Sequence, residues 1–394
     1  MAHNLLVKTL VIVTLFGAKV ARIFDKEMAS EKLFSLHNYR YRSVNNSEAY
    51  DLWKLWVRFN DKWYKTSQEE FKRFEIFKGN LETIKNLNIQ NKDAEFALNH
   101  FADISHDEMK SKILMPKRKA PVFEKERYIV QNHGHVTLPA EFDWRDHGVV
   151  TAVKNQGSAG SCWAFSTVGN LEGIWALAGH TLTNLSVEQI VDCDGTKDAA
   201  HHHADCGIFG GWPYLAYQYV IRAGGIESDK SLPYCSGFGG APGQCFMCQA
   251  KGFNKTLCGP PIPWCNQTCS DVLDRSKFIP GLKVSNWKAV DSNETIIAEQ
   301  LIKLGPLSIA LNAELLVFYH SGVFDPWATF CPPDELDHAV LLVGFGKYKG
   351  WFHTTDYWLV KNSWGPSWGE NGYFRISRGK GTCGVNTAVT TAEL

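Results

Sequence analysis

Residues 155–165 read NQGSAGSCWAF and place a cysteine, Cys162, between a glycine-rich turn and an apolar run. Gly157 and Gly160 permit a tight backbone approach just before it. Residues 161–178 then carry apolar side chains on one helical side and end before a glycine, so the pattern predicts a helix that Cys162 opens. Because a helix N-terminus favours an anion, this cysteine is either a structural residue or a nucleophilic thiolate.

The number of cysteines and the N-terminal residues indicate an oxidising compartment. The chain has 394 residues and eleven cysteines, and an apolar run over residues 9–18 follows Lys8. That run fits the core of a signal peptide and is too short to span a bilayer. We therefore expect a signal peptide over residues 1–21, a lysosomal or secreted destination and mostly paired cysteines. Five Asn-X-Ser/Thr sequons are compatible with a glycoprotein. Eleven is odd, so one thiol stays free unless an intermolecular disulfide forms.

The charge of the chain is balanced overall and uneven along its length. The formal net charge is zero, and nothing in it indicates a nucleic-acid or membrane partner. No later apolar run is long enough for a transmembrane span. Residues 1–135 carry 23 Lys and Arg against 17 Asp and Glu, a charge of +6, and residues 136–394 carry −6. This asymmetry is either chance scatter or the sign of two parts that dock through complementary charge.

The order of the predicted elements indicates an α+β fold. Helices are expected over residues 47–64 and 67–88, the second with a Ser67–Glu70 capping box, and residues 110–135 resemble a linker. Further helices are expected over 161–178, after Ser186, and over 213–222 and 294–304, and strands predominate from residue 281 onward. Helices first and strands second predict two subdomains within the second part of the chain. Two irregular insertions, at about 194–205 and 235–269, interrupt this part.

Cys162 acquires a chemical role only together with three other residues. A cysteine nucleophile needs a base, and His338 begins a predicted strand in ELDHAVLLVGFG. The base needs a group that orients its ring, and Asn362 in YWLVKNSWG can supply an amide. A developing oxyanion needs donors, which the backbone N–H of Cys162 and the side-chain amide of Gln156 can supply.

On these residues the chain resembles the papain-like cysteine proteases. GSCWAF at 160–165 matches the pattern around their nucleophile, with a His and an Asn following in that order. The resemblance implies Cys162 as nucleophile, His338 as acid and base, Asn362 as orienter and Gln156 as oxyanion donor, with Trp364 shielding the His–Asn contact. It also implies a helical left subdomain and a β-barrel-like right subdomain.

The resemblance extends into the first part of the chain and suggests a cathepsin L/F-like zymogen with an ERFNIN-type propeptide. The helix at 67–88 matches that propeptide pattern at Glu69, Arg73, Ile76, Phe77, Asn80, Ile84 and Asn88. A second propeptide pattern matches at Ala97, Asn99, Phe101 and Asp103. The implied organisation is an inhibitory propeptide over 22–135, acting as an intramolecular inhibitor, and a catalytic domain over 136–394.

The implied function is a cysteine endopeptidase that hydrolyses protein and peptide substrates through an acyl-enzyme intermediate. The resemblance implies no cofactor, no metal and a monomer. Its motifs place these residues along the substrate: Gly210, Gly211, Trp212, Pro213, Ala310, Leu336 and Ala388. The last five would line the pocket for P2, the residue two before the cut. They are apolar, so an apolar residue is expected at P2.

The chain departs from the family in its cysteines. Ala159 and Ile208 stand where most relatives have a disulfide. The resemblance implies a disulfide between Cys331 and Cys383, and it leaves the pairing open for Cys193, Cys206, Cys235, Cys245, Cys248, Cys258, Cys265 and Cys269.

Three other functions are possible alternatives to an endopeptidase. The cysteine-rich insertion could restrict the cleft, as in an exopeptidase. The chain could be a non-catalytic binding protein or decoy on the same fold. The run His201-His202-His203, with Cys245 and Cys248, could also indicate a zinc-binding protein.

Overall fold

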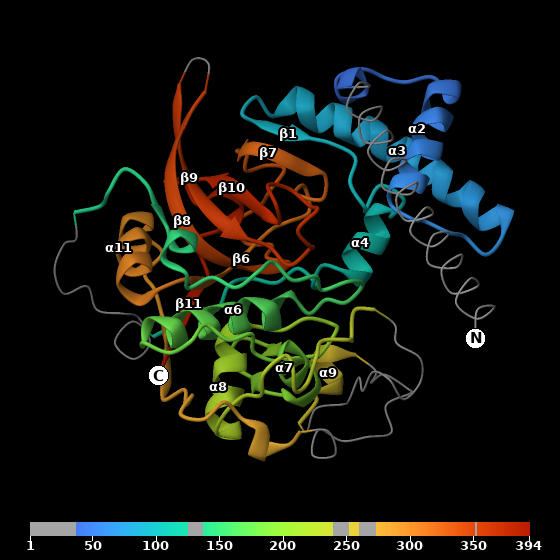
Figure 1. Ribbon diagram of the computed structural model, residues 1–394. Coiled ribbons are helices and arrows are strands. Elements are labelled where there is room, and N and C mark those ends of the chain that lie inside the picture. The colour runs from blue at the N-terminus through green and yellow to red at the C-terminus, as the bar shows by residue number, and fades with distance from the viewer. Residues whose placement is uncertain (1–36, 125–136, 239–251, 260–272, 351–352) are drawn as a thin grey trace, which may run out of the picture. The chain divides into compact units, whose positions relative to one another are not determined.

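The computed structural model describes residues 37–124, 137–238, 252–259, 273–350 and 353–394 (Figure 1). They form two compact units, one of residues up to 90 together with 96–105, and one of residues 91–95 together with 106–394. The predicted signal peptide and most of the second insertion lie outside the described residues. Within these ranges, the structure contains no helix that is long and apolar enough to cross a membrane.

The first unit is helical. Its elements are η1 (His37–Arg40), α2 (Asn46–Phe59) and α3 (Ser67–Gln90). Asn45 caps α2 in a reciprocal capping box with Glu48. The capping box predicted for α3 is wrong by one residue, because the Glu69 N–H donates to Thr66 Oγ1 at 3.1 Å and the Glu69 carboxylate accepts from the Lys65 N–H.

The core of the first unit explains the polar positions of its long helix. Trp53, Trp56 and Phe77 pack together with ring centroids 5.3–5.5 Å apart. The Asn80 Nδ2 donates to the carbonyls of residues 102 and 104. The Asn88 side chain both donates to and accepts from the backbone of residue 96, at 2.9 and 2.8 Å. These amides therefore hold the chain that follows the helix against it, which satisfies buried backbone groups.

The second unit contains the remaining elements. Its helices are α4 (His106–Lys112), η2 (Trp144–His147), α6 (Cys162–Leu177), α7 (Val187–Cys193), α8 (Pro213–Ala223), α9 (Lys255–Cys258), η3 (Arg275–Lys277), α11 (Glu294–Leu304) and η4 (Thr382–Gly384). Its strands are β2 (Phe142–Asp143), β3 (Lys197–Asp198), β4 (His203–Ala204), β5 (Asn286–Ala289), β6 (Leu307–Leu311), β7 (Tyr319–Phe324), β8 (His338–Lys349), β9 (Thr354–Lys361), β10 (Tyr373–Ser377) and β11 (Val389–Glu393). Strand β1 (Ala94–Phe96) begins in this unit.

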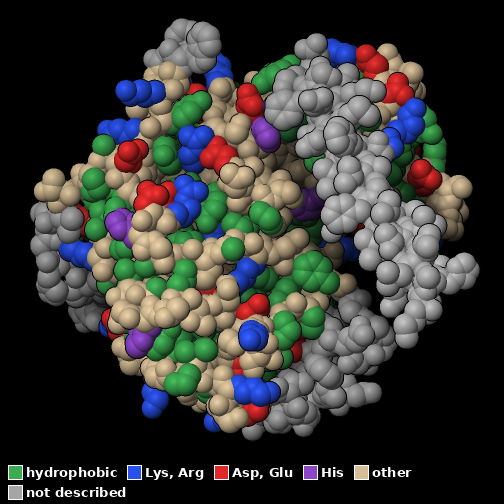
Figure 2. Space-filling view, in the orientation of Figure 1, with side chains coloured by type: hydrophobic (Ala, Val, Ile, Leu, Met, Phe, Trp, Pro, Cys, Tyr) green, Lys and Arg blue, Asp and Glu red, His purple; other side chains and the backbone are tan. Residues whose placement is uncertain are grey.

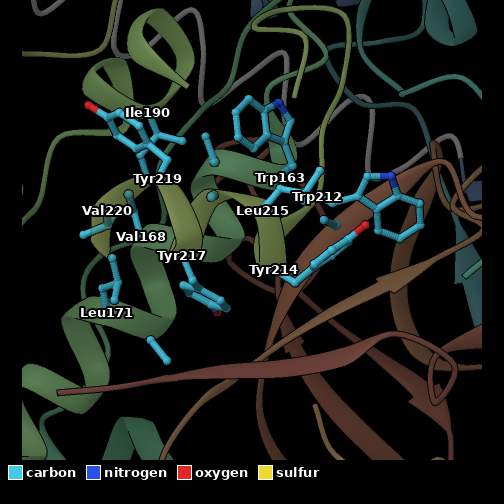
Figure 3. Close-up of a cluster of buried hydrophobic side chains, with 14 of the residues drawn as sticks. Trp163, Val168, Leu171, Ile190, Trp212, Tyr214, Leu215, Tyr217, Tyr219 and Val220 are labelled. Carbon is cyan, nitrogen blue, oxygen red and sulfur yellow. The ribbon is translucent and has the colours of Figure 1, made fainter. Parts of the chain in front are cut away.

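Helices α6, α7 and α8 form one subdomain around a shared apolar core. Figure 3 shows side chains of the three helices converging, among them Val168, Leu171, Ile190 and Val220, each at most 2% exposed. Helix α6 is buried along nearly its whole length, so its apolar residues surround it rather than form a stripe. The start of α8 extends this core toward the strands through Trp212 and Tyr214 (Figure 3).

The other subdomain is built on one large sheet. Its strands run in the order β1-β7-β10-β9-β8-β6-β11-β5, with β2 added beside β8. The long antiparallel pair β8 and β9 is central in this order and extends beyond the other strands in Figure 1. Strand β8 also pairs with β6, where His338 lies opposite Leu311. Helix α6 packs against β8, and this contact brings the helix that begins at Cys162 to the strand that begins at His338.

The α+β fold class and the order of helices and strands are confirmed. The sequence analysis missed α4, β7 and β11, and it assigned residues 113–118 to a linker although Arg118 pairs with Leu336 in a β-bridge. The charge of −6 in the second part does not form a one-signed surface on the face in Figure 2, where basic and acidic side chains are interspersed.

Candidate active site

Cys162 lies at the first residue of α6 and has no exposed surface. It is the free cysteine among the described residues. The hydroxyl of the N-cap residue, Ser161, does not cap the helix and instead lies 2.7 Å from the Tyr234 hydroxyl. The Ala339 N–H donates to the Sγ atom at 3.5 Å, and the backbone N–H groups of Cys162 and Trp163 also lower the pKa of the thiol.

His338 directly precedes Ala339, whose N–H contacts this thiol, and two neighbours fix the protonation pattern of the His338 ring. Its Nε2 is 2.8 Å from Asn362 Oδ1, and the Ser363 N–H donates to the same oxygen at 2.8 Å. Since Oδ1 is the acceptor in both contacts, Nε2 of the neutral ring carries the proton and Nδ1 carries the lone pair. Nδ1 is buried and has no hydrogen-bond partner among the described residues, so it is available as a base.

Trp364 covers this pair. Its ring stacks on the His338 ring with centroids 4.8 Å apart and planes at 29°, and Trp368 packs edge-on against Trp364. Trp364 is 1% exposed and Asn362 is 3% exposed. The indoles therefore keep water away from the His338–Asn362 hydrogen bond, which strengthens it.

Burial keeps the two reactive groups neutral in this structure. Burial raises the pKa of the Cys162 thiol to about 12, against the smaller opposite effect of the backbone donors around Sγ. Burial also lowers the pKa of His338 to about 4. The position of Cys162 at a helix N-terminus predicts that a thiolate is favoured. That expectation is wrong for this form of the chain, because the loss of hydration outweighs the helix dipole.

Gln156 connects the loop before α6 to the segment that contains Ile113. Its Nε2 donates to the Ala159 carbonyl at 2.7 Å and to the Ile113 carbonyl at 2.8 Å. Its Oε1 accepts from the Ser363 hydroxyl at 2.7 Å. The amide that the sequence analysis assigned to an oxyanion is thus occupied by a carbonyl of residue 113. Ser363, which sequence reasoning did not single out, links Gln156 to the Asn362 side chain, and its position directly after Asn362 was the available signal.

The segment after Ile113 continues past the residues predicted to contact substrate. The Met115 N–H donates to the Asp337 carbonyl at 2.7 Å, and the Gly211 N–H points at the Met115 sulfur at 3.4 Å. A side chain at Gly210, where φ is +106°, would come within 3.1 Å of Met115 Cβ. Met115 also belongs to the buried cluster that contains Trp212, Ala310, Leu336 and Ala388. Pro213 is buried at the first turn of α8.

The structure pairs four of the cysteines and shows how the departure from the family at Ala159 is accommodated. Cys331 pairs with Cys383, the pair implied by the resemblance, and Cys206 pairs with Cys258, which the sequence left open. Cys193 and Cys235 are also disulfide-bonded. Ala159 is buried, and the segment around it is held by the Gly160 N–H, which donates to the Ile208 carbonyl at 2.8 Å.

Comparisons with known proteins cover nearly the whole chain. Residues 138–393 match the family described as papain family cysteine protease, and residues 53–109 match the cathepsin propeptide inhibitor domain (I29). The chain is similar to cathepsin F of Drosophila melanogaster, with 36% identity over 372 residues that cover 93% of this chain and 53% of that protein. It therefore spans about half the length of this relative. It is also similar to cysteine proteinase 1 of Dictyostelium discoideum, with 37% identity over 85% of this chain and 91% of that protein.

A solved structure shares the fold over most of the chain. This is the digestive procathepsin L2 proteinase from Tenebrio molitor larval midgut, with a TM-score of 0.68 and 29% identity. The match covers 88% of this chain and 100% of that one.

Proposed function

Because the chain belongs to the papain family of cysteine proteases, we propose that it is an endopeptidase zymogen in which Cys162 is the nucleophile. The predicted family, the papain-like fold and the presence of a propeptide inhibitor domain are confirmed by the comparisons. The single observation that supports the assignment of the site is the contact of Cys162 with the strand that carries His338, whose Nδ1 is left as a bare buried base.

The reaction begins once the segment over the site has left. Nδ1 of His338 accepts the proton of the Cys162 thiol, and the thiolate attacks the carbonyl carbon of a peptide bond. The Cys162 N–H and Gln156 Nε2 stabilise the oxyanion. The imidazolium then gives its proton to the leaving amine as the C–N bond breaks. A water molecule, deprotonated by His338, cleaves the thioester, releases the carboxylic acid and restores the thiol.

Two effects keep the proposed protease inactive before the segment leaves, one steric and one electrostatic. The Ile113 carbonyl occupies the Gln156 donor, and Met115 belongs to the buried apolar cluster that contains the residues proposed for P2. The same segment contributes to the burial that holds the thiol and the imidazole neutral. Removal of the segment restores hydration of Cys162 and His338. The helix N-terminus then favours the thiolate, and His338 carries the positive charge of the thiolate–imidazolium pair.

The walls of the site support a preference for an apolar residue at P2. Trp212, Ala310, Leu336 and Ala388 share one buried apolar cluster, and Met115 of the propeptide joins it. A buried apolar pocket disfavours a charged side chain by the cost of removing its hydration. A substrate library with all residues at P2 tests this preference, and a preference for arginine or lysine there would contradict it.

A thiol-labelling experiment tests the proposed nucleophile. The acid-activated protein is incubated with an epoxide thiol probe, and the adduct is mapped by peptide mass spectrometry. Labelling is expected at Cys162, absent in Cys162→Ser and strongly reduced in His338→Ala. An activated protein that cleaves no peptide substrate and takes up no label would sink the proposal.

Two further expectations complete the proposal. Blocking both ends of a peptide distinguishes an endopeptidase, which still cleaves it, from an exopeptidase restricted by the cysteine-rich insertion.

The disulfides Cys206–Cys258 and Cys331–Cys383 support maturation in an oxidising compartment. Such a compartment fits the proposed signal peptide over residues 1–21 and a lysosomal or secreted destination. We propose that the protein is a monomer there.

A further inference from the structure

The histidine-rich insertion and the cysteine-rich insertion meet at one place in the structure. The first forms the β3–β4 hairpin, with His201 and His202 in its turn, and the second contributes the short helix α9. The disulfide between Cys206 and Cys258 ties the two together. We call residues 198–203 and 254–258 the insertion wall. The catalytic mechanism above assigns it no role.

The insertion wall holds the guanidinium group of Arg118. One terminal nitrogen, Nη1, donates to the His202 carbonyl at 3.3 Å, and the other, Nη2, donates to the Leu257 carbonyl at 3.2 Å. Each carbonyl thus comes from a different insertion. Burial lowers the pKa of Arg118, while the charge of Asp205 opposes that shift and favours the protonated group. A forked cation with two separated donors fits this pair of acceptors, whereas an ammonium group presents a single point of charge.

The histidines of the wall contact the same stretch of propeptide beyond Arg118. His201 Nε2 lies 3.0 Å from the Val122 carbonyl, and its Nδ1 lies 2.6 Å from Asp198 Oδ2. His203 stacks on Trp212 with ring centroids 4.3 Å apart. Burial, and next the charge of Arg118, lower the pKa of His203 to about 4, so it is neutral beside the guanidinium. The stacking of His203 on Trp212 thereby fixes the insertion wall to one of the residues proposed to line the P2 pocket.

The backbone of Arg118 is fixed on the opposite side. Its N–H donates to the Leu336 carbonyl at 2.9 Å, and its carbonyl accepts from the Leu336 N–H at 2.9 Å. Arg118 therefore crosses from the sheet subdomain, where its backbone pairs, to the insertion wall, where its side chain binds. Met115, three residues earlier, joins the apolar cluster of the pocket proposed for P2. The contacts of the guanidinium, with the His202 and Leu257 carbonyls, are separate from the apolar cluster that Met115 joins.

We propose that the insertion wall is an arginine-binding subsite of the mature enzyme, adjacent to the P2 pocket, which the propeptide fills with Arg118. In the mature enzyme, the carbonyls of His202 and Leu257 then receive an arginine of the substrate, at P3 or P4. This inference rests on the proposed function, since it needs a peptide bound along the same path. It assigns to the two insertions a part in substrate selection as well as in latency.

A set of substrates tests the subsite in the mature enzyme. Peptides with leucine at P2 and blocked ends vary the residue at P3 or P4 among arginine, lysine, citrulline and methionine. The kcat/KM for arginine is expected to exceed that for methionine by about tenfold at one of the two positions, because hydrogen bonds from a charged donor are the stronger ones. Lysine and citrulline, which each keep part of the interaction, are expected between the two.

Two variants separate the wall from the rest of the cleft. Replacing both cysteines of the tether, Cys206→Ser with Cys258→Ser, is expected to reduce the arginine-to-methionine ratio to less than about threefold, since Leu257 is no longer held beside His202. In the proenzyme, Arg118→Met is expected to raise the rate of epoxide labelling about tenfold. The matched control Lys119→Met removes the same charge at the next residue and should stay within about twofold of the unchanged proenzyme.

Two outcomes would overturn the subsite. The first is equal kcat/KM for arginine and methionine at both positions. The insertion wall would then bind the propeptide but not the substrate. The second is a labelling rate for Arg118→Met equal to that for Lys119→Met. A protein that cleaves none of the substrates and takes up no probe fails differently, because that result contradicts the proposed protease itself.

Discussion

Two regions of the second unit hold the propeptide segment, and they do so in different ways. Around Cys162, the segment meets side-chain groups that are almost fully buried, and Gln156 has no exposed surface. At the insertion wall, the segment meets mainly backbone carbonyls and a histidine at a partly exposed edge. The first region is the proposed site of the chemistry, where we expect one misplaced group to stop the reaction. The second is a surface for selection, where single contacts change rates modestly.

The largest expected effect concerns the reactivity of the thiol. With a pKa of about 12 for Cys162 in the proenzyme, the thiolate fraction at pH 8 is roughly 10³-fold below that of a thiol with the ordinary value. We therefore expect iodoacetamide to modify Cys162 at least about 10³ times more slowly in the proenzyme than in the activated enzyme at the same pH.

The control for this measurement is the urea-unfolded Cys162→Ser variant, which reports modification of the other cysteines. Proenzyme and activated enzyme that reacted at similar rates would show that the segment does not suppress the thiolate. The contrast between a buried chemical site and an exposed wall would then be lost.

The next effect tests Gln156 as a donor to the oxyanion. Gln156→Ala removes Nε2 and is expected to lower kcat by about 10² to 10³ with little change in KM, because the oxyanion forms only after attack. Steady-state kinetics on an apolar P2 substrate, normalised by active-site titration, gives both constants. A variant that changed KM alone would assign Gln156 to ground-state binding.

A smaller effect is expected for Ser363, which positions Gln156 through its hydroxyl. Ser363→Ala is expected to lower kcat about tenfold and to leave KM unchanged, since an unanchored amide stabilises the oxyanion less well. The same change in the Gln156→Ala background should add little, because the two residues act through one contact. Ser363→Thr keeps the hydroxyl and is the rescue variant. Full additivity of the two single losses would remove this positioning role.

The smallest effect concerns the release of the propeptide by acid. Glu314 binds Lys110, Lys117 and His106 of the segment. Burial raises the pKa of Glu314, but the two lysines outweigh it, so the net pKa lies below the ordinary value. The contribution of this carboxylate to docking is therefore present above about pH 4.5 and is lost as the pH falls through the lowered pKa.

Glu314→Gln removes that contribution at every pH. The midpoint of activation is expected to move up by roughly half a pH unit, a modest shift because the lysines are partly exposed to solvent. Processing followed on gels between pH 3.5 and 6.5 measures it, with Glu335→Gln, which contacts Lys117 alone, as the weaker control. An unchanged midpoint in Glu314→Gln would assign acid activation to other groups.

The family and the α+β class could be predicted from the sequence alone, and so could a proposed site of Cys162 and three further residues. These residues lie in short sequence patterns that can be recognised without the structure. Examples are a helix that begins at Cys162 and a strand that begins at His338. The helical cores were predictable for the same reason, since the spacing of apolar residues reflects a local period.

The contacts between distant parts of the chain could not be predicted from these local patterns. The contact of Ile113 with Gln156 joins residues 43 apart, and the Cys206–Cys258 disulfide joins residues 52 apart. The side chain of Arg118 contacts residues 84 and 139 positions away. The pKa of Cys162 was misjudged for the same reason. A helix N-terminus can be recognised along the chain, whereas the loss of hydration that outweighs it depends on every segment that packs over the thiol.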